Sequence, residues 1–245
     1  MSTIKSHKFD VSKVSLKENI KNKDPMRGKQ FYVNYDNSLF RLQTPVMSMP
    51  YNIGIYGDNG ENKKYTIDVA FRDLDSDYRV KGFHDNMKQL EEFIKEQAMA
   101  KSKEWFGNKK LSKDVVEDKF NPIVKQSIDK ATGEPDGRYA DTIKFKLPFY
   151  DEKPSFVVKD FDDNVIENPQ LDVLFTKESR VQALLKCGGV YVISGKYGCT
   201  WSIEQIRIDP KEVGGGELNF INDSDDSDND EEVNESSDDD SSDDE

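Results

Sequence analysis

Cysteine is scarce in this chain: only Cys187 and Cys199 occur in 245 residues. So low a number excludes a disulfide scaffold and fits a reducing compartment. Long hydrophobic runs are also missing, because no stretch approaches the roughly 18 apolar residues of a membrane span. Residues 1–29 carry lysines in place of the apolar stretch of a signal peptide. We therefore expect an intracellular protein that does not associate with membranes.

Groups suited to catalysis are few as well. His7 and His84 are the only histidines, which leaves little material for a histidine base paired with a nucleophile. No glycine-rich loop followed by Lys-Ser or Lys-Thr is present to hold a phosphate. Two cysteines and two histidines far apart in the sequence do not indicate a zinc site. The sequence therefore predicts a protein that is not an enzyme and uses neither a metal nor another cofactor.

Charge is distributed unevenly along the chain. The formal net charge of −13 divides into −14 from residues 222–245, which hold 14 acidic residues and no basic one, and +1 from the rest. All 26 aromatic residues lie at or before Phe220, so only the first part can bury a core. This division predicts a basic N-terminal arm at 1–29, a globular domain at 30–213, and a glycine joint with a disordered acidic tail at 214–245. Part of the arm, around 9–14, is expected to dock as a short strand.

Alternation of apolar and polar side chains predicts β-strands in most of the globular part. Ile143, Phe145 and Leu147 alternate with Lys144 and Lys146, which is typical of a strand with one buried face. The same kind of pattern, with intervening turn residues, predicts further strands at 31–35, 39–42, 52–57, 64–72, 155–161, 181–194 and 199–208.

The last two of these strands form the clearest hairpin. Gly188 and Gly189 indicate a bulge in its first strand. With the turn centred on Lys196 and Tyr197, the two cysteines are expected to lie roughly 20 Å apart, at ~3.3 Å per residue. That separation is far beyond the reach of a disulfide.

A helical period interrupts the strands. Apolar residues recur every three or four positions at Phe83, Met87, Leu90, Ile94 and Ala98. The spacing predicts a helix from Asp85, its expected N-cap, to Trp105, with Gly107 ending it. A shorter helix is expected at 112–119.

Several strands with one long helix between them predict a mainly β fold, an OB-fold-like antiparallel barrel with one inserted α-helix. A β-sandwich is the second choice, because it would show turns every 8–12 residues and no long helix.

Basic and aromatic residues are interleaved on the predicted strands. Proteins that bind single-stranded nucleic acid combine a positive groove for phosphates with aromatic rings on which bases stack. Candidate phosphate contacts are Lys64, Arg72, Lys109, Lys110, Lys125, Lys144 and Lys146, and candidate stacking rings are Tyr32, Tyr35, Phe40, Tyr150, Tyr191 and Tyr197. For each of them the alternative is an ordinary solvated lysine or a core aromatic residue. Neither kind of contact distinguishes DNA from RNA.

The acidic tail has a charge density like that of a nucleic acid backbone. Treated as a flexible coil, it spans roughly 27 Å, which exceeds the ~17 Å radius of gyration expected for the body. We therefore expect it to compete with DNA for a basic groove and, when displaced, to bind a basic partner; a tail that only aids solubility is the alternative. Its expected partner-binding residues are Asp223, Asp225, Asp226, Asp228, Asp230, Glu231, Glu232, Asp238, Asp239, Asp240, Asp243, Asp244 and Glu245.

Several short stretches, in their order along the chain, resemble one protein family. They are Leu42-Gln43-Thr44-Pro45-Val46-Met47, Trp105-Phe106-Gly107, Phe120-Asn121-Pro122-Ile123-Val124-Lys125, residues 139–146, and Gly198-Cys199-Thr200-Trp201 with Gln205. Together with the tail, and with the helix placed between strands three and four, they resemble the acidic-tailed single-stranded DNA-binding proteins of the phage T-seven type, in the branch found in nucleocytoplasmic large DNA viruses.

This resemblance implies an OB-fold core, sequence-independent binding of single-stranded DNA during viral replication, recombination or repair, and a homodimer. It also implies a tail that docks on replication enzymes such as a polymerase or a helicase-primase, in a viral replication compartment of the host cytoplasm or nucleus. One departure concerns the docking. Tails of the phage members end in an aromatic residue, whereas this chain ends in Asp243-Asp244-Glu245 and its nearest aromatic residue is Phe220. Only electrostatic docking is therefore carried over.

Two other functions fit the same composition. An acidic-tailed chaperone for histones or other basic proteins would use the tail itself as its binding site. A viral transcription or structural protein would use the β-rich body as a docking module.

Overall fold

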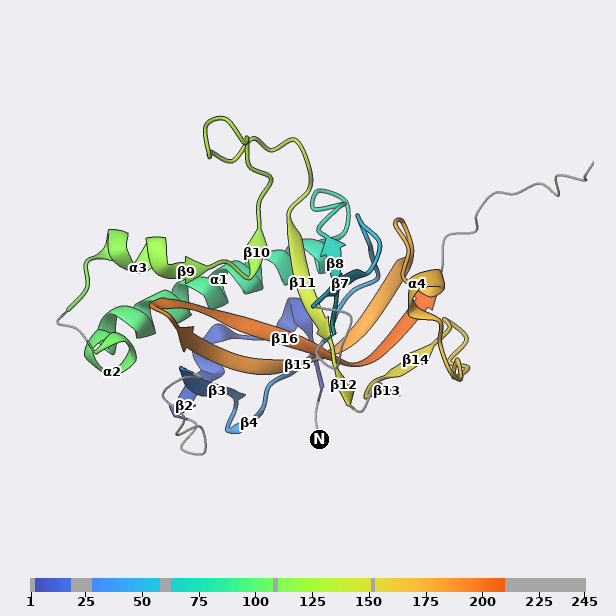
Figure 1. The fold of residues 1–245 in the computed structure, drawn as a ribbon, viewed down its shortest axis with the longest axis horizontal. Helices are drawn as coiled ribbons and strands as arrows, with labels where there is room; N and C mark the ends of the chain where they lie inside the picture. Colours follow the sequence, from blue (N-terminus) through green and yellow to red (C-terminus); the bar gives the residue numbers. More distant parts are fainter. Residues whose placement is uncertain (1–2, 19–27, 58–62, 108–109, 151–152, 210–245) are drawn as a thin grey trace, which may run out of the picture. The chain divides into compact units, whose positions relative to one another are not determined.

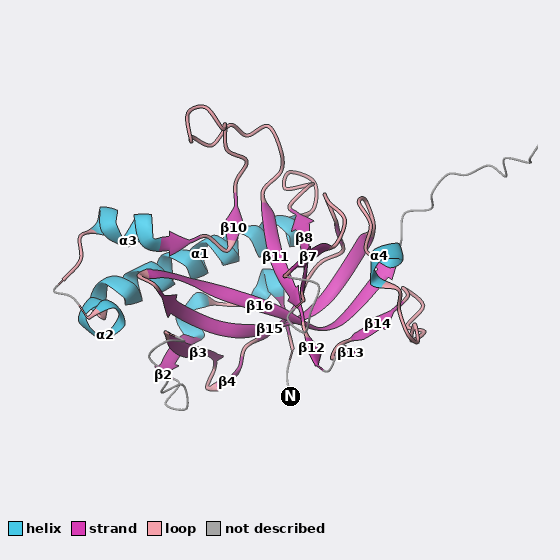
Figure 2. Ribbon diagram, viewed as in Figure 1, coloured by secondary structure: helices cyan, strands magenta, loops and turns pink. Residues whose placement is uncertain are grey.

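The computed structural model describes residues 3–18, 28–57, 63–107, 110–150 and 153–209, all within a single unit that spans Met1–Lys211 (Figure 1). Lys109 and the acidic tail, both singled out from the sequence, lie outside the described residues. The described fold is mainly β (Figure 2). Its strands are β1 Ile4–Lys5, β2 Val14–Glu18, β3 Lys29–Tyr35, β4 Ser38–Leu39, β5 Arg41–Gln43, β6 Met47–Ser48, β7 Gly54–Tyr56, β8 Lys64–Ala70, β9 Phe120–Asn121, β10 Val124–Lys125, β11 Thr142–Leu147, β12 Phe149–Tyr150, β13 Lys153–Pro154, β14 Val157–Lys159, β15 Arg180–Ile193 and β16 Lys196–Asp209.

Five of these strands close a ring in the order β6–β8–β11–β16–β15 and back to β6. Four of the five contacts are antiparallel, and β11 meets β16 in parallel, with Lys146 opposite Ser202. A sheet that closes on itself has no free edge within the ring. The predicted OB-fold-like barrel is thereby confirmed, and the β-sandwich is excluded.

The predicted faces of the ring strands are also confirmed. Ile143, Phe145 and Leu147 are buried inside the barrel, and Lys144 and Lys146 of the same strand point outward. On β16, Trp201 and Ile203 are buried in the same core.

The long helix begins earlier than the sequence predicts. Helix α1 spans Tyr78–Ala100, and its N-cap is Asp77, whose carboxylate accepts a hydrogen bond of 2.8 Å from the backbone N–H of Arg79. The apolar stripe starts at Val80, one turn before Phe83, so the prediction of Asp85 as the N-cap was wrong. The other helices are α2 Ser102–Phe106, α3 Lys113–Lys119 and α4 Leu171–Leu174.

The position of α1 in the topology differs from the expectation as well. It follows β8, the second strand of the ring, and precedes β11, the third. Trp105 belongs to the separate α2, which ends at Gly107 in a left-handed conformation (φ +69°). The second helix predicted at 112–119 is confirmed as α3. Within the described residues no helix has the length and apolar character to cross a membrane.

The hairpin of β15 and β16 turns two residues earlier than predicted. Ile193 pairs with Lys196, and the turn residues Ser194 and Gly195 have φ values of +51° and +77°. Two consecutive positive φ values match the twist of a tight antiparallel hairpin, which a turn centred on Lys196 and Tyr197 would not provide. Figure 1 shows these two long strands (orange) reaching the helical region of α2 and α3.

The separation predicted for the two cysteines was wrong for the same reason. The Sγ atoms of Cys187 and Cys199 lie 3.5 Å apart. The earlier turn places Val190 opposite Cys199, and the confirmed glycine bulge shifts the register so that Cys187 faces Trp201. Cys199 is therefore only two positions from the residue opposite Cys187.

The N-terminal segment contributes to the sheet. Strand β1 pairs in parallel with β5, and β2 pairs with β3. Phe9 and Val14 are buried in the core. The segment docks as predicted, but the strand predicted around 9–14 was wrong: the chain forms two short 3-10 turns, Ser6–Lys8 and Val11–Lys13, and the strand β2 begins only at Val14.

Candidate functional site

A groove of about 950 Å³ lies on the outer face of the barrel. It is lined by residues of β3, β8, β11, β15 and β16, and one side is formed by residues 121–125. Four lysines line it, and no aspartate or glutamate is among the described residues that do so. They are Lys29, Lys125, Lys144 and Lys146. A concave surface lined by charges of one sign attracts ligands of the opposite sign.

The two lysines of β11 differ in their surroundings. Lys144 donates a hydrogen bond of 2.8 Å to Asp68, its cross-strand neighbour on β8. Burial acts to lower the pKa of Lys144, but the hydrogen bond and charge of Asp68 together with the Tyr56 hydroxyl outweigh it, so the pKa is raised. Much of its charge is therefore already balanced by a carboxylate.

Lys146 has no such partner among the described residues. It faces Thr66 on β8 and Ser202 on β16. Burial, and then the positive charge of Lys64, lower the pKa of Lys146. An anion placed against this ammonium group would reverse the effect, so Lys146 is the better phosphate contact of the two.

Tyr191 supplies an aromatic ring to the groove. It is half-buried, and its hydroxyl accepts a hydrogen bond of 3.0 Å from the Asn121 side chain on the opposite side. Trp201 forms part of the floor but is only 1% exposed, and its ring packs edge-on against Phe40 in the core. Tyr56 lies beside the groove, with the Lys144 ammonium group 5.4 Å from its ring centre. Tyr191 and Tyr56 therefore present rings next to the lysines.

A buried glutamate holds the side of the groove in place. Glu91, 3% exposed on α1, accepts hydrogen bonds from the backbone N–H groups of Ile123 (2.6 Å) and Val124 (2.8 Å). Sequence reasoning missed this residue. Its signal was an acid within the apolar stripe of the helix, next to Leu90, since a buried carboxylate requires partners.

The structure brings four of the sequence-predicted residues together in the groove: Lys125, Lys144, Lys146 and Tyr191. Lys64 is exposed beside it and acts on Lys146 through its charge. Arg72 lies elsewhere and forms a bidentate ion pair with Glu178, at 2.6 and 2.9 Å. Lys110 is exposed and does not line the groove. Lys29 was not predicted as a contact, because the sequence analysis assigned it to the N-terminal arm at 1–29; its ammonium group donates to the backbone carbonyl of Glu104.

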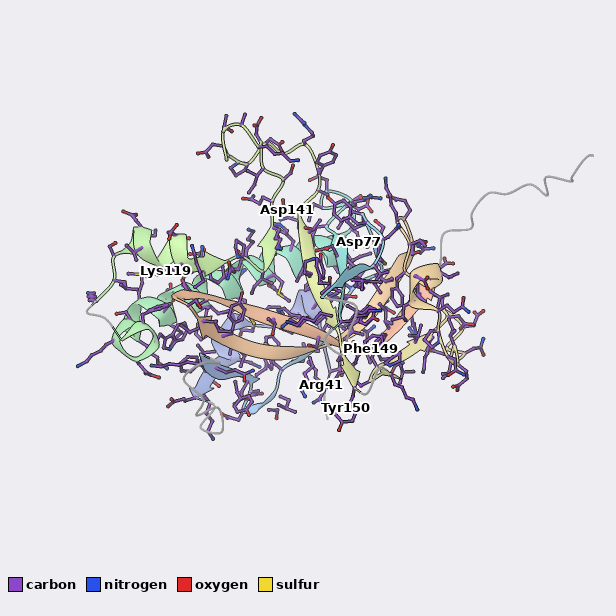
Figure 3. The ribbon with its side chains drawn as sticks, viewed as in Figure 1. Arg41, Asp77, Lys119, Asp141, Phe149 and Tyr150 are labelled. Atoms are coloured by element: carbon purple, nitrogen blue, oxygen red, sulfur yellow. The ribbon has the colours of Figure 1, made fainter. Side chains whose placement is uncertain are left out.

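The remaining predicted stacking rings lie outside the groove. Phe40 and Tyr197 are core residues, 1% and 0% exposed, so the prediction that they offer a free face was wrong; the Tyr197 hydroxyl donates to the Val116 carbonyl. Tyr35 stacks on Phe40. Tyr32 is exposed on β3, and Tyr150, which is 75% exposed, projects away from the barrel (Figure 3).

The lining residues suit the binding of a polyanion. Lysine ammonium groups, threonine hydroxyls and a tyrosine ring can hold a polyanion that carries flat apolar groups. Neither a histidine nor a carboxylate is among the described lining residues, so the groove offers no general acid–base pair of that kind. In the described part of the chain no three His, Cys, Asp or Glu side chains gather in a way that could hold a metal ion.

No protein-family model and no curated protein matches this sequence. Among solved structures, the chain is similar to gp2.5, a single-stranded DNA-binding protein encoded by bacteriophage T7, at 14% identity and a TM-score of 0.44, over 74% of this chain and 98% of that one. It is also similar to a single-stranded DNA-binding protein from bacteriophage Enc34. In complex with single-stranded DNA that protein gives 12% identity and a TM-score of 0.40, over 81% of this chain and 97% of that one. Solved without DNA it gives 14% identity and a TM-score of 0.39, over 86% and 98%. Identities and TM-scores of this size do not assign a function to the chain.

Proposed function

We propose that this protein binds single-stranded DNA, independently of sequence, in the groove formed by β8, β11, β15, β16 and residues 121–125. The observation that carries the proposal is the lining itself: four lysines, no carboxylate, and the ring of Tyr191. Lysines bind the phosphates of any sequence, and every base has a flat face that can stack on a ring. The faces of bases are covered in a duplex, so a groove of this kind favours single strands.

The direct test is a titration of fluorescent oligo-dT and of a duplex of the same length. We expect tighter binding of the single strand and a steep loss of affinity with salt. Four phosphate contacts at roughly 0.7 released counterions each give a slope of about −2 to −3 when the logarithm of the association constant is plotted against the logarithm of the salt concentration. No binding of oligo-dT at about 50 mM salt, or equal affinity for duplex and single strand, would contradict the proposal.

We further propose that the protein acts in DNA replication, recombination or repair, and that its acidic C-terminal segment regulates the groove. The support is the composition of residues 222–245, whose 14 carboxylates imitate the charge of a nucleic acid backbone. The tail and DNA then exclude one another from the lysines, and DNA binding releases the tail for basic surfaces of replication proteins.

Deletion of residues 222–245 tests this role. We expect tighter binding of oligo-dT by the shortened chain. The gain should be largest at low salt, because salt screens the attraction between the acidic tail and the lysines and so weakens the tail as a competitor. Unchanged or weaker binding after the deletion would overturn the competition. Sedimentation of both chains, with and without oligo-dT, measures whether the protein forms the homodimer that the resemblance implies.

A further inference from the structure

One thiol of the groove floor, that of Cys199, is in contact with a second thiol on the neighbouring strand. The Sγ atoms of Cys187 on β15 and Cys199 on β16 lie 3.5 Å apart, and both cysteines are reduced. Cys187 is 9% exposed, whereas Cys199 is only partly buried and lines the groove. Cys199 is therefore the member of the pair that borders the groove, on the side on which the proposed ligand binds.

The glycine bulge between the strands brings the thiols together. In the register of the outer part of the hairpin, where Val190 faces Cys199, residue 187 would lie three positions from Cys199 and its side chain would point to the other face. The shift at Gly188 makes Cys187 pair with Trp201 instead. Cys199 is then two positions along β16 from Trp201, the residue opposite Cys187, and side chains at this diagonal spacing share a face of the sheet.

The bulge is packed closely against β16, so a change at this pair must move its neighbours. Gly189 has φ +93°, a conformation that other residues rarely adopt. A Cβ on Gly188 would lie 2.4 Å from the Thr200 hydroxyl oxygen, so the two strands are packed here without slack. A movement of the bulge toward β16 must therefore displace Thr200, another groove residue.

We propose that Cys187 and Cys199 are an oxidisable pair that forms a disulfide in the groove floor when a peroxide reaches it, and that this bond weakens binding in the groove. Bond formation would shorten the sulfur–sulfur distance from 3.5 Å to about 2.05 Å and pull the bulge toward β16. The weakening rests on the proposed function; the formation of the bond does not.

The reaction balances with hydrogen peroxide as the oxidant. The Cys199 thiolate attacks one peroxide oxygen, the O–O bond breaks, and a sulfenic acid and hydroxide form. The Cys187 thiolate then attacks the sulfenic sulfur, the S–O bond breaks, and a second hydroxide leaves. The two hydroxides take up the two thiol protons as water, so two thiols and one peroxide give one disulfide and two waters. The sulfurs lose the two electrons that the peroxide gains.

The electrostatic surroundings set the pace of this reaction. The contact with Cys187, and then burial, raise the pKa of Cys199, and the charge of Lys146 acts in the opposite direction. Because the thiolate is the reactive form, a raised pKa makes the pair slow to oxidise at neutral pH and faster in mild alkali.

Trypsin provides a direct readout on the unaltered full-length chain. It cleaves after Lys186, Lys196 and Arg207, so the two cysteines fall on separate peptides, 187–196 and 197–207. After treatment with hydrogen peroxide we expect these peptides to appear joined in the mass spectrum, and to separate on reduction with dithiothreitol. Absence of the joined peptides at both neutral and mildly alkaline pH would overturn the proposal.

Binding of oligo-dT is then measured before peroxide, after peroxide and after dithiothreitol. We expect a severalfold loss of affinity on oxidation and full recovery on reduction, and neither change in Cys187→Ser or Cys199→Ser. Joined peptides with unchanged affinity would overturn the effect on the groove. If the reduced protein does not bind oligo-dT, the proposed function is wrong. The mass spectrum of the tryptic peptides still shows whether the two cysteines form a disulfide.

Discussion

The ammonium group of Lys144 lies 2.8 Å from the Asp68 carboxylate on the neighbouring strand, whereas no carboxylate of the described residues pairs with Lys146, two positions along. The two lysines belong to one strand and one face, yet they should contribute unequally to phosphate binding. Before a phosphate can bind Lys144, the Asp68 carboxylate must be displaced; if it stays, it repels the phosphate. Lys146 gains its counterion only when an anion arrives.

Lys146→Ala should therefore weaken oligo-dT binding by roughly five- to tenfold at low salt and lower the magnitude of the salt slope by about 0.7. Asp68→Asn should have the opposite effect and tighten binding by roughly two- to fivefold, the range expected for releasing one partly exposed ion pair. Fluorescence titrations at several salt concentrations measure both. Lys177→Ala, an exposed lysine outside the groove, controls for the loss of one positive charge. Equal effects of Lys146→Ala and Lys177→Ala would show that the groove has no special role.

Tyr191→Ala should lower oligo-dT affinity by about 1–3 kcal/mol, the range measured for loss of one base–ring contact. Tyr191→Phe keeps the ring and loses only the hydrogen bond from Asn121, so it should bind nearly as well as the parent chain. Tyr150→Ala is the matched control, because Tyr150 is more exposed than Tyr191 but lies outside the groove. An effect of Tyr150→Ala as large as that of Tyr191→Ala would place the stacking surface elsewhere.

Glu91→Ala should destabilise the fold by about 1–3 kcal/mol, because it leaves the buried backbone N–H groups of Ile123 and Val124 without an acceptor. The segment 121–125 would also loosen and oligo-dT affinity would fall. Glu91→Gln retains an oxygen acceptor and should be milder in both respects. Urea unfolding followed by circular dichroism measures the stability. A Glu91→Ala chain as stable as the parent would contradict the inferred role.

Asp77 should contribute to stability in a pH-dependent way. Its hydrogen bond from Arg79 is the main factor that lowers the pKa of Asp77 to about 2, below an ordinary value of 3.8. Since the folded pKa is the lower one, this contribution is present above about pH 4 and is lost as pH falls toward 2. Asp77→Ala should cost about 1 kcal/mol at pH 7 through loss of the N-cap. Asp77→Asn keeps a capping oxygen but cannot titrate.

Melting temperatures at pH 7, 4 and 2.5 separate these effects. The difference between the parent and Asp77→Asn should shrink between pH 4 and 2.5, whereas Asp77→Ala should already be less stable at pH 7. A constant difference across this range would mean that the ion pair with Arg79 does not stabilise the folded state.

Local patterns predicted much of the fold. The alternation from Ile143 to Leu147 identified a strand and its buried face, because side chains on a strand alternate between its two sides. The apolar spacing from Phe83 to Ala98 identified the long helix. Its start was missed because Asp77 and Asp85 are both acceptable N-caps, and only the contacts of Val80 with the core distinguish them.

The groove could be predicted only in part. Lys144, Lys146 and Tyr191 were chosen as an outward lysine pair and a strand aromatic, yet the same reasoning chose Phe40 and Tyr197, which are buried. An aromatic residue in a strand has the same local pattern whether it packs inward or binds a ligand. Which of the two applies depends on what the rest of the chain packs against the ring. The Tyr197 hydroxyl donates to the Val116 carbonyl, and the Trp201 ring packs against Phe40, so both rings are held in the core.

The amino-acid sequence by itself determined the charge division, the buried and exposed faces of the strands and the helix stripe, because each of these depends on composition or on neighbours a few positions away. Only the tertiary structure decided which lysine is neutralised, which glutamate holds the side of the groove and which thiols touch. Those outcomes depend on strand register and on a one-residue bulge, and a shift of one position reverses the side to which every following residue points.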